Sequence, residues 1–298
     1  MKKLSPEQII SLGREMYDSM AECLLCPKEC GVDRLNGELG ECLTGSEPFV
    51  ASWDFHFGEE PPLVGNGGSG TIFMANCNLA CKYCQNYHFS QEGEGFEVTV
   101  ERLAEIMLEL QETTASNINL VTPSHQVAVI LMAIGRAKKA GLRIPIVYNC
   151  SGYEKEEIIR KLAGIIDIYL VDMRYNNNEV AREYSGCENY VAINRAAVKE
   201  MYRQVGDLKT DDDGLALSGL MVRHLVLPND LSGSEGIFQF LAEEVSRETS
   251  VSLMSQYHPA YRALTDEKIN RRITKDEFDK AKRAFYKAGL ENGHIQDL

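Results

Sequence analysis

The chain has 298 residues, of which 44% are hydrophobic, and this is enough to bury one sizeable core. Its 31 Lys and Arg residues against 44 Asp and Glu residues give a net charge of −13, which disfavours nucleic acid because phosphate backbones are held by cationic side chains. The amino terminus lacks the apolar run of a signal peptide, and no stretch approaches the roughly 18 apolar residues of a membrane span. We therefore expect a cytoplasmic protein with no nucleic-acid or membrane partner.

The predicted elements begin with a short helix over residues 5–20. Residues 21–69 follow as an irregular stretch that is rich in cysteine, glycine and proline and has little periodicity. From residue 70 onward, short apolar runs alternate with stretches of 3.6-residue apolar spacing, which is typical of amphipathic helices. The candidate strands cover residues 71–75, 118–122, 144–149, 166–172, 220–227 and 251–256. The helices between and after them cover about 100–110, 125–140, 154–162, 191–205, 235–247 and 275–288.

Strands that alternate with helices indicate an α/β fold, in which a parallel sheet is joined by right-handed crossovers. Six such units are too few for a complete eight-stranded barrel and favour an open, partial (β/α)6 barrel. We expect two domains: residues 1–69 as a helix followed by a Cys-rich metal-binding module, and residues 70–298 as the partial barrel.

The central motif follows the first predicted strand and has the spacing Cys77-x3-Cys81-x2-Cys84. Three thiolates in one loop can hold three irons of a [4Fe–4S] cluster, which normally takes four, so one iron stays open. An open iron can chelate the amino and carboxylate groups of S-adenosylmethionine (SAM), and an electron passed to the sulfonium then yields a 5′-deoxyadenosyl radical. The alternatives are a zinc site or buried thiols, although zinc sites usually pair two cysteine knuckles.

With Tyr83 directly before the third cysteine, this motif resembles the signature of the radical SAM superfamily. The resemblance extends from about residue 20 to 290 and is strongest to the pyruvate formate-lyase-activating-enzyme-like branch, in particular the PflX-like proteins. It implies a radical SAM barrel, SAM as a cofactor, and a reductant such as flavodoxin or ferredoxin. The matching stretches are Cys-Pro-Lys-Glu-Cys-Gly-Val at 26–32, Gly-Glu-Glu-Pro-Pro at 58–62, Gly-Ser-Gly-Thr-Ile-Phe at 68–73, Asn-Leu-Val-Thr-Pro-Ser-His at 119–125, Ile-Val-Tyr-Asn at 146–149 and Arg-His-Leu-Val-Leu-Pro at 223–228.

The carboxyl ends of parallel strands meet at one edge of a sheet, so polar residues there are candidates for the SAM pocket. After the second predicted strand, related activating enzymes carry a Gly-Gly-Glu motif that binds the SAM amino group, and this sequence departs from it. Thr122, Ser124 and His125 stand there instead and are candidate replacements, or Ser124 caps the following helix. The resemblance also implies contacts to adenine near Gln85 and Asn86.

Later strand ends supply the remaining cofactor-binding candidates. The resemblance implies that Asn149 and Ser151, at the end of the third strand, face the ribose and carboxylate of SAM. Asp172 and Arg174 follow the fourth strand and fit a contact to the SAM carboxylate or to substrate, or else a structural ion pair. On the fifth strand, alternation sends either His224 or the arginine before it inward, and we expect His224 to face the barrel interior.

A second group of cysteines, Cys23, Cys26, Cys30 and Cys42, brings four thiolates into 20 residues. Four is the number needed by a closed zinc site or by a second [4Fe–4S] cluster, and the sequence leaves both open. Glu59 and Glu60 follow this module. Such a paired carboxylate could bind substrate or lie in a solvated loop.

Three functions agree with these patterns. The first is a radical SAM enzyme of the glycyl-radical-enzyme-activating type, which abstracts hydrogen from a glycine of a protein partner. The second is radical modification of a peptide or small molecule. The third is a non-catalytic iron–sulfur electron-transfer protein, against which the three-cysteine loop argues because an electron carrier would complete its cluster with a fourth cysteine.

Overall fold

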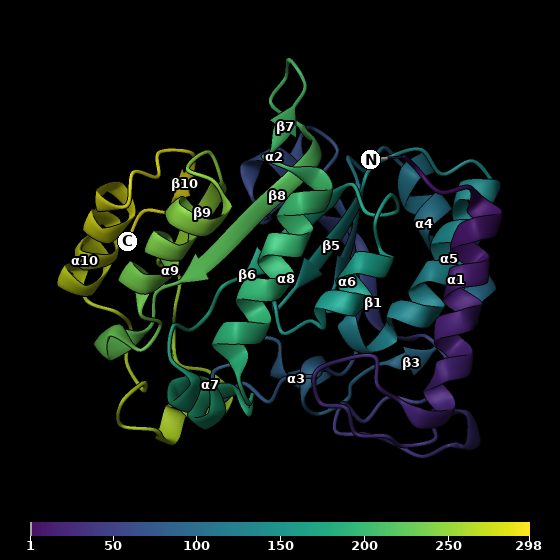
Figure 1. The fold of residues 1–298 in the computed structure, drawn as a ribbon, viewed down its shortest axis with the longest axis horizontal. Coiled ribbons are helices and arrows are strands. Elements are labelled where there is room, and N and C mark those ends of the chain that lie inside the picture. The colour runs from purple at the N-terminus through teal and green to yellow at the C-terminus, as the bar shows by residue number, and fades with distance from the viewer. Residues whose placement is uncertain (1) are drawn as a thin grey trace.

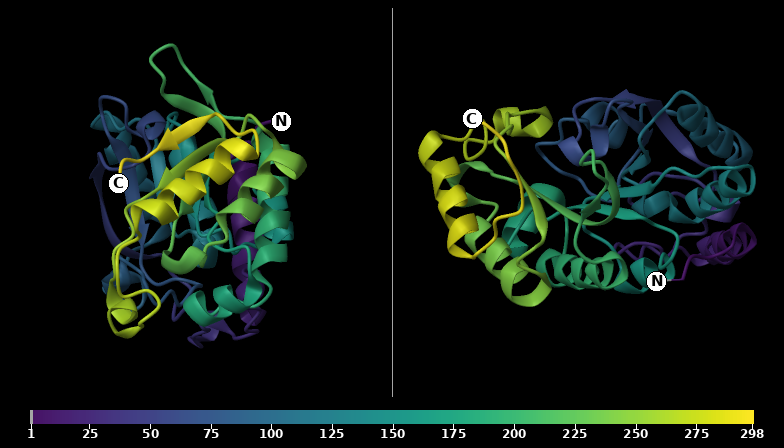
Figure 2. Two further views of the ribbon diagram at one scale, coloured as in Figure 1. Left: turned by 90° about the vertical axis from the view of Figure 1, so that its left-hand side faces the viewer. Right: turned by 90° about the horizontal axis from the view of Figure 1, so that it is seen from above.

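The computed structural model describes residues 2–298 and shows an open, curved sheet whose central strands are all parallel (Figure 1). The six predicted strands correspond to β2 (Ser69–Met74), β4 (Ile118–Val121), β5 (Ile146–Cys150), β6 (Ile168–Asp172), β8 (Ala216–Leu225) and β9 (Ser250–Met254). These strands are neighbours in that order and pair in parallel. The α/β partial-barrel prediction is therefore confirmed, and Figure 2 shows the sheet from two further sides.

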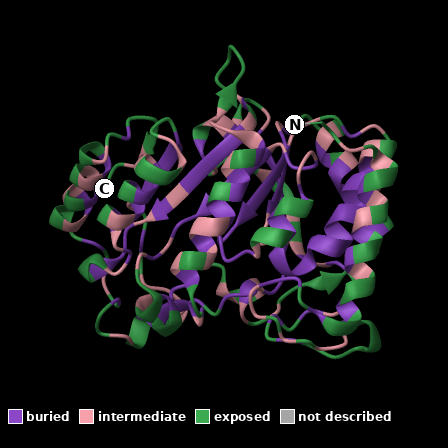
Figure 3. Cartoon of the chain, in the orientation of Figure 1, coloured by how far each residue is buried: buried purple, intermediate pink, exposed green. Residues whose placement is uncertain are grey.

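Helices cover the outer face of the sheet, while their exposed sides face the solvent (Figure 3). They are α4 (Val100–Glu112), α5 (Val127–Lys139), α6 (Glu156–Lys161), α7 (Asn178–Ser185), α8 (Tyr190–Val205), α9 (Ser234–Phe240) and α10 (Lys275–Lys287). The helix predicted at 235–247 is α9, which continues as a π-helical turn over Leu241–Val245. Among the described residues, no helix combines the length and apolar character needed to cross a membrane.

The amino-terminal helix α1 (Pro6–Asp18) packs against α5 (Figure 1). It begins with a capping box in which Ser5 and Gln8 satisfy each other's backbone amides, and Pro6 occupies its first turn. The two helices approach closely because each places a glycine at the contact. A Cβ on Gly13 would lie 2.7 Å from Met132 Cγ, and one on Gly135 would lie 2.6 Å from Ile10 Cγ1.

The sequence did not reveal a strand within the irregular stretch. Residues Phe49–His56 form β1, which pairs antiparallel with β2 and with the short β3 (Phe96–Glu97). Only Val50 of β1 is fully buried, and the rest of the strand alternates partly buried residues such as Trp53 and Phe55 with exposed ones, so it lacks the continuous apolar run of the central strands. The division at residue 69 stays a prediction, although β1 extends the sheet across it. Two further pieces extend the other side: β7 (Lys209–Thr210) pairs with β8, and β10 (Gly293–Ile295) pairs with β9.

The inside of the barrel is closed at the amino ends of its strands by a one-turn helix, α2 (Pro61–Val64). Leu63 of this helix packs into a small apolar cluster formed by inward side chains of the strands. Asn117 donates to the Leu63 carbonyl at 2.7 Å and Ser116 donates to the Val64 carbonyl at 2.9 Å, which anchor the plug. The other cluster members are Val147, Ile168, Leu170, Ala216 and Met221.

Candidate functional site

The predicted cluster loop leaves the carboxyl end of β2 and has no regular structure over residues 77–84. Asn76 starts it with a left-handed backbone (φ 65°) and donates to the Leu43 carbonyl at 2.8 Å, so the loop is tied to the Cys-rich segment. Further along, the Ala80 amide donates to the Ser185 carbonyl at 3.0 Å and the Lys82 amide to the Tyr184 carbonyl at 2.8 Å. These bonds fix the loop against the end of α7.

The three sulfurs of the loop lie near one another and near hydrogen-bonding groups. Cys81 Sγ lies 3.0 Å from Ser185 Oγ and accepts from Arg174 Nη1 at 3.2 Å, and Cys84 Sγ lies 3.0 Å from Ser90 Oγ. Burial raises the pKa of Cys77 and of Cys84, and the neighbouring thiols raise both further. Thiols that ionise with such difficulty in the empty protein become thiolates readily when a cationic metal group compensates their charge.

This donor set fits a [4Fe–4S] cluster. The three thiols belong to one short loop, and Arg174 and two serines are placed to hydrogen-bond their sulfurs. Such bonds are among the features that tune iron–sulfur clusters.

A cavity of about 170 Å³ opens beside Cys84 at the carboxyl ends of the strands, and we call it the upper cavity. Five of the predicted cofactor-binding residues line it: Tyr83, Gln85, Asn86, Asp172 and Arg174. Its other lining residues are Cys84, Arg223, Leu225, Met254 and Gln256. The structure thus brings the candidate adenine contacts and the Asp-Arg pair next to the cysteine loop.

Asp172 joins two arginines at the edge of the upper cavity. It accepts from Arg223 Nε at 2.8 Å and from Arg174 Nε at 3.1 Å, and Arg223 also donates to Asn149 Oδ1 at 2.7 Å. Burial would raise the pKa of Asp172, but the two guanidinium groups outweigh it and hold this pKa below its usual range. Asn149 therefore belongs to the same network through Arg223, which was not among the predicted site residues.

The residues in place of the Gly-Gly-Glu motif do not line the upper cavity. Thr122 has a left-handed backbone (φ 60°), and Ser124 donates to the buried Glu154 carboxylate. Ser124 makes no capping hydrogen bond to α5, so the expectation of a cap there is wrong. His125 is buried with Nε2 at 3.0 Å from the Ala75 carbonyl, and burial lowers its pKa to about 4. Ser151 is also buried, and its hydroxyl accepts from the Tyr153 amide at 3.4 Å.

The expectation that His224 faces the barrel interior is wrong. Its ring lies against Phe238 of α9, with Nε2 at 2.9 Å from Ser234 Oγ and Nδ1 at 2.8 Å from the Met173 carbonyl. Arg223 takes the inward position instead. The physical reason is the register of β8 with β6, which pairs Arg223 with Asp172 and places both side chains on one face.

Two of the amino-terminal cysteines, Cys23 and Cys42, lie near the buried Arg34. Burial raises the pKa of Cys26 to about 12, and it also raises the pKa of Cys42, to which the Cys23 thiol adds. Arg34, 2% exposed, donates to the Gly45 carbonyl at 3.0 Å and to the His125 carbonyl at 2.7 Å, and it lies 3.7 Å from Cys23 Sγ. Within residues 2–298, no three cysteine sulfurs lie mutually within 4.8 Å.

Glu59 and Glu60 are the most informative residues that sequence reasoning left undecided. Both side chains are buried, at 7% exposure for the Glu59 side chain and 8% for Glu60, so the solvated-loop interpretation is wrong. Glu59 Oε2 lies 3.7 Å from Arg223 Nη1. The available signal was the Pro-Pro pair that follows, since proline favours the first turn of a helix and here starts the plug α2.

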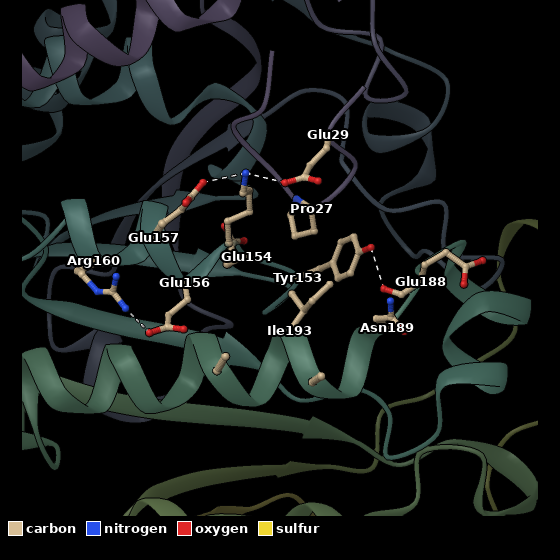
Figure 4. A pocket seen from close by; sticks show the side chains of 13 residues that line it. Pro27, Glu29, Tyr153, Glu154, Glu156, Glu157, Arg160, Glu188, Asn189 and Ile193 are labelled. Carbon is tan, nitrogen blue, oxygen red and sulfur yellow. Dashed lines mark hydrogen bonds and ion pairs between the residues drawn. The ribbon is translucent and has the colours of Figure 1, made fainter. Parts of the chain in front are cut away.

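A larger cavity of about 640 Å³ lies between the Cys-rich segment and α8 (Figure 4). Lys155 lies between the carboxylates of Glu29 and Glu157, at 2.7 and 2.8 Å, and Arg160 pairs with Glu156 (Figure 4). The two cationic side chains that line this cavity, Lys155 and Arg160, are thus already paired with acidic side chains. Neither cysteine group lines it, so its size alone does not make it the site.

Comparison with known proteins agrees with this geometry. A family model described as a 4Fe-4S single cluster domain matches residues 63–193, a stretch that contains the three-cysteine loop. A structure of HydG, titled a maturase of the [FeFe]-hydrogenase, superposes with a TM-score of 0.50 at 13% identity, over 99% of this chain and 63% of HydG. The HydG structure from Carboxydothermus hydrogenoformans gives a TM-score of 0.49 at 16% identity, over 74% of this chain and 50% of HydG. The chain spans less than two thirds of either HydG chain.

The likeness to HydG shows a shared fold, and the cluster-domain match covers the part of the chain that contains the cysteine loop. Uncharacterized protein MJ0674 of Methanocaldococcus jannaschii is 31% identical over 271 residues, which cover 87% of this chain and 72% of that protein. The chain belongs to the same family as this archaeal protein.

Proposed function

We propose that this protein is a radical SAM enzyme whose [4Fe–4S] cluster is held by Cys77, Cys81 and Cys84. The observation that carries the proposal is the placement of these three cysteines in one loop, with Cys84 lining the upper cavity and Arg174 donating to Cys81. When bound, the cluster supplies an electron that cleaves SAM to methionine and a 5′-deoxyadenosyl radical. A flavodoxin or ferredoxin would supply that electron.

The protein's own part is to orient and shield these groups. Tyr83 Oη lies 2.6 Å from Tyr175 Oη, which lies 2.6 Å from Ser185 Oγ, which in turn reaches Cys81 Sγ. Tyr175 and Ser185 are fully buried, so this chain of hydroxyls excludes water from one side of the loop. It also fixes which sulfur receives a hydrogen bond, a feature that tunes cluster potential.

We place SAM in the upper cavity. Gln85 and Asn86 would contact adenine, while Asn149 and the Asp172–Arg174 pair would contact its ribose or methionine portion. The other predicted residues at the strand ends would not contact SAM directly and would instead support the residues that do. They are Thr122, Ser124, His125 and Ser151. His224 is no longer a candidate, because its ring packs against Phe238 and lies within hydrogen-bonding distance of Ser234, both on α9.

For the amino-terminal cysteines we propose a second [4Fe–4S] cluster in a separate module of residues 1–69. Zinc bound to four thiolates at about 2.3 Å would draw the sulfurs to about 3.8 Å from one another. A cluster of several irons bridges wider sulfur spacings than a single zinc ion does, and no three cysteine sulfurs of the described residues lie mutually within 4.8 Å. The nearby guanidinium of Arg34 would offset part of the negative charge of such a site.

Two substrates are proposed for the radical. Resemblance to activating enzymes suggests a glycine of a protein partner. The buried carboxylates Glu59 and Glu60 favour the second candidate, modification of a small molecule or peptide that enters the barrel.

The proposal is tested by electron paramagnetic resonance of the reduced, reconstituted protein with and without SAM. SAM should change the cluster signal, because it binds the open iron. Cys81→Ala should lose the SAM-sensitive signal and keep the signal of the amino-terminal site. A cluster signal that ignores SAM in the native protein would refute the open-iron site.

A further inference from the structure

The barrel interior holds a layer of polar groups below the upper cavity. Glu59 and Glu60 enter it from the loop before the plug helix α2, and Arg223 reaches it from β8. Arg223 contacts Asp172, its register partner on β6, through Nε, and it lies 3.7 Å from Glu59 through Nη1. This position is deep in the barrel, where a substrate would lie beneath SAM.

Several atoms of this layer have no partner within the protein. Asn119, an inward residue of β4 with no exposed surface, leaves both its amide nitrogen and its amide oxygen without a hydrogen bond. Glu60 Oε2 is also buried and unpaired, and so is Ser252 Oγ on β9. Buried polar atoms are rarely left without partners, because each costs about 1–3 kcal/mol. Three of these four atoms are hydrogen-bond acceptors.

The carboxyl groups of the layer outnumber its guanidinium groups. Three carboxylates, those of Glu59, Glu60 and Asp172, face two guanidinium groups, those of Arg174 and Arg223. Arg174 pairs with Asp172 and donates to the sulfur of Cys81, and it forms no ion pair with either glutamate. Among the described residues, no Lys or Arg forms an ion pair with Glu60.

A second cavity, of about 410 Å³, reaches this layer from the amino ends of the strands, and we call it the lower cavity. Glu60, Glu248 and Ser252 line it, with His294 at its edge. Among the residues that the structure describes, no Lys or Arg lines it. β8 and β9 line both cavities: Arg223 and Met254 line the upper one, and Met221 and Ser252 the lower one. A molecule in the lower cavity thus lies one layer of side chains from the proposed SAM site.

We propose that Glu60, supported by Glu59 and Asn119, binds a positively charged amine of the substrate inside the barrel. An ammonium group carries three N–H donors and no acceptor, so it suits a site of unpaired acceptor atoms beside a carboxylate that has no cationic partner. The inference rests on the proposed function, since it names the substrate class of that site. It favours an amine-bearing small molecule or a lysine-like side chain over a neutral glycine segment.

The test uses saturation-transfer NMR on the full-length, reconstituted protein with three small probes of one size: propylammonium, 1-propanol and propionate. Propylammonium should bind and the two others should not. Glu60→Gln keeps the shape and removes the charge, and it should weaken propylammonium about tenfold or more, as expected for a charged hydrogen bond. Glu156→Gln, which alters an exposed acid paired with Arg160, is the matched control and should leave binding unchanged.

Two results would overturn the inference. One is preferential binding of propionate, which would make Arg223 the anchor and the substrate an anion. The other is equal propylammonium binding by the native protein and Glu60→Gln. If thermal denaturation shows that Glu60→Gln is unfolded, Asn119→Asp replaces it as the test. The added carboxylate should tighten propylammonium binding, and an unchanged affinity would refute the site. SAM cleavage is assayed separately, so a native protein that cleaves SAM but does not bind propylammonium counts against this inference alone.

Discussion

Replacing Glu59 by Gln is expected to stabilise the protein at alkaline pH. Burial raises the pKa of this carboxyl to about 7; the nearby Arg223 opposes the rise and Glu60 adds to it. The folded protein therefore holds a proton on Glu59 at pH values where the unfolded chain has lost it.

The sign and size of the effect follow from this difference. Below pH 4.5, the ordinary value, Glu59 is protonated in both states and costs nothing. Between pH 4.5 and 7 the folded state binds more protons, so stability falls as pH rises, and above 7 the full cost is present. The gap between 4.5 and about 7 corresponds to roughly 3 kcal/mol of unfolding free energy.

Thermal unfolding under anaerobic conditions measures this effect from pH 5 to 9. Glu59→Gln should gain roughly 5–10 °C over the native protein at pH 8.5 and almost nothing at pH 5. Glu156→Gln controls for the loss of a surface acid. Parallel pH profiles for the native protein and Glu59→Gln would refute the assignment of a buried, hard-to-ionise carboxyl.

Three further changes test other parts of the molecule. Cys81→Ala should lose about one cluster's worth of iron on reconstitution, whereas Cys187→Ala, at a fully buried thiol nearby, should keep it; equal iron contents would contradict the site. Arg34→Met removes a buried donor to two carbonyls and should lower the unfolding free energy by about 3 kcal/mol, and an unchanged thermal midpoint would show that the arginine is dispensable. Glu277, whose hydrogen bonds from Arg271 lower its pKa to about 2, stabilises the fold above pH 4.5 and loses this contribution as pH falls towards 2. Glu277→Gln should therefore be about 2 kcal/mol less stable at pH 7 and equal to the native protein near pH 2, as measured by denaturant unfolding.

The strand pattern of the barrel could be predicted because buried parallel strands are continuous apolar runs. β5 and β6 are buried along their whole length, and both were found within two residues of their ends. β1 could not be found in the same way, because it lies near the sheet edge and buries only Val50 fully. Its position depends on pairing with β2, which sequence spacing does not encode.

The arrangement of side chains could be predicted where one loop alone determines it and could not be predicted where strand register decides. The spacing of Cys77, Cys81 and Cys84 places them in one loop, and the structure brings their sulfurs near Arg174. The choice between Arg223 and His224 depends on which of two adjacent side chains points inward, and a one-residue change of register reverses it. The burial of Glu59 could not be predicted from the sequence for a related reason. It depends on how the plug helix α2 packs into the barrel, which local sequence does not determine.

The central claim is most directly tested by assaying SAM cleavage. The protein is reconstituted with iron and sulfide, reduced with dithionite under anaerobic conditions and given SAM, and 5′-deoxyadenosine and methionine are measured by mass spectrometry. The account predicts both products from the native protein and from Cys187→Ala, and neither from Cys77→Ala. Equal product formation by Cys77→Ala, or none by a native protein whose cluster is fully assembled, would contradict it.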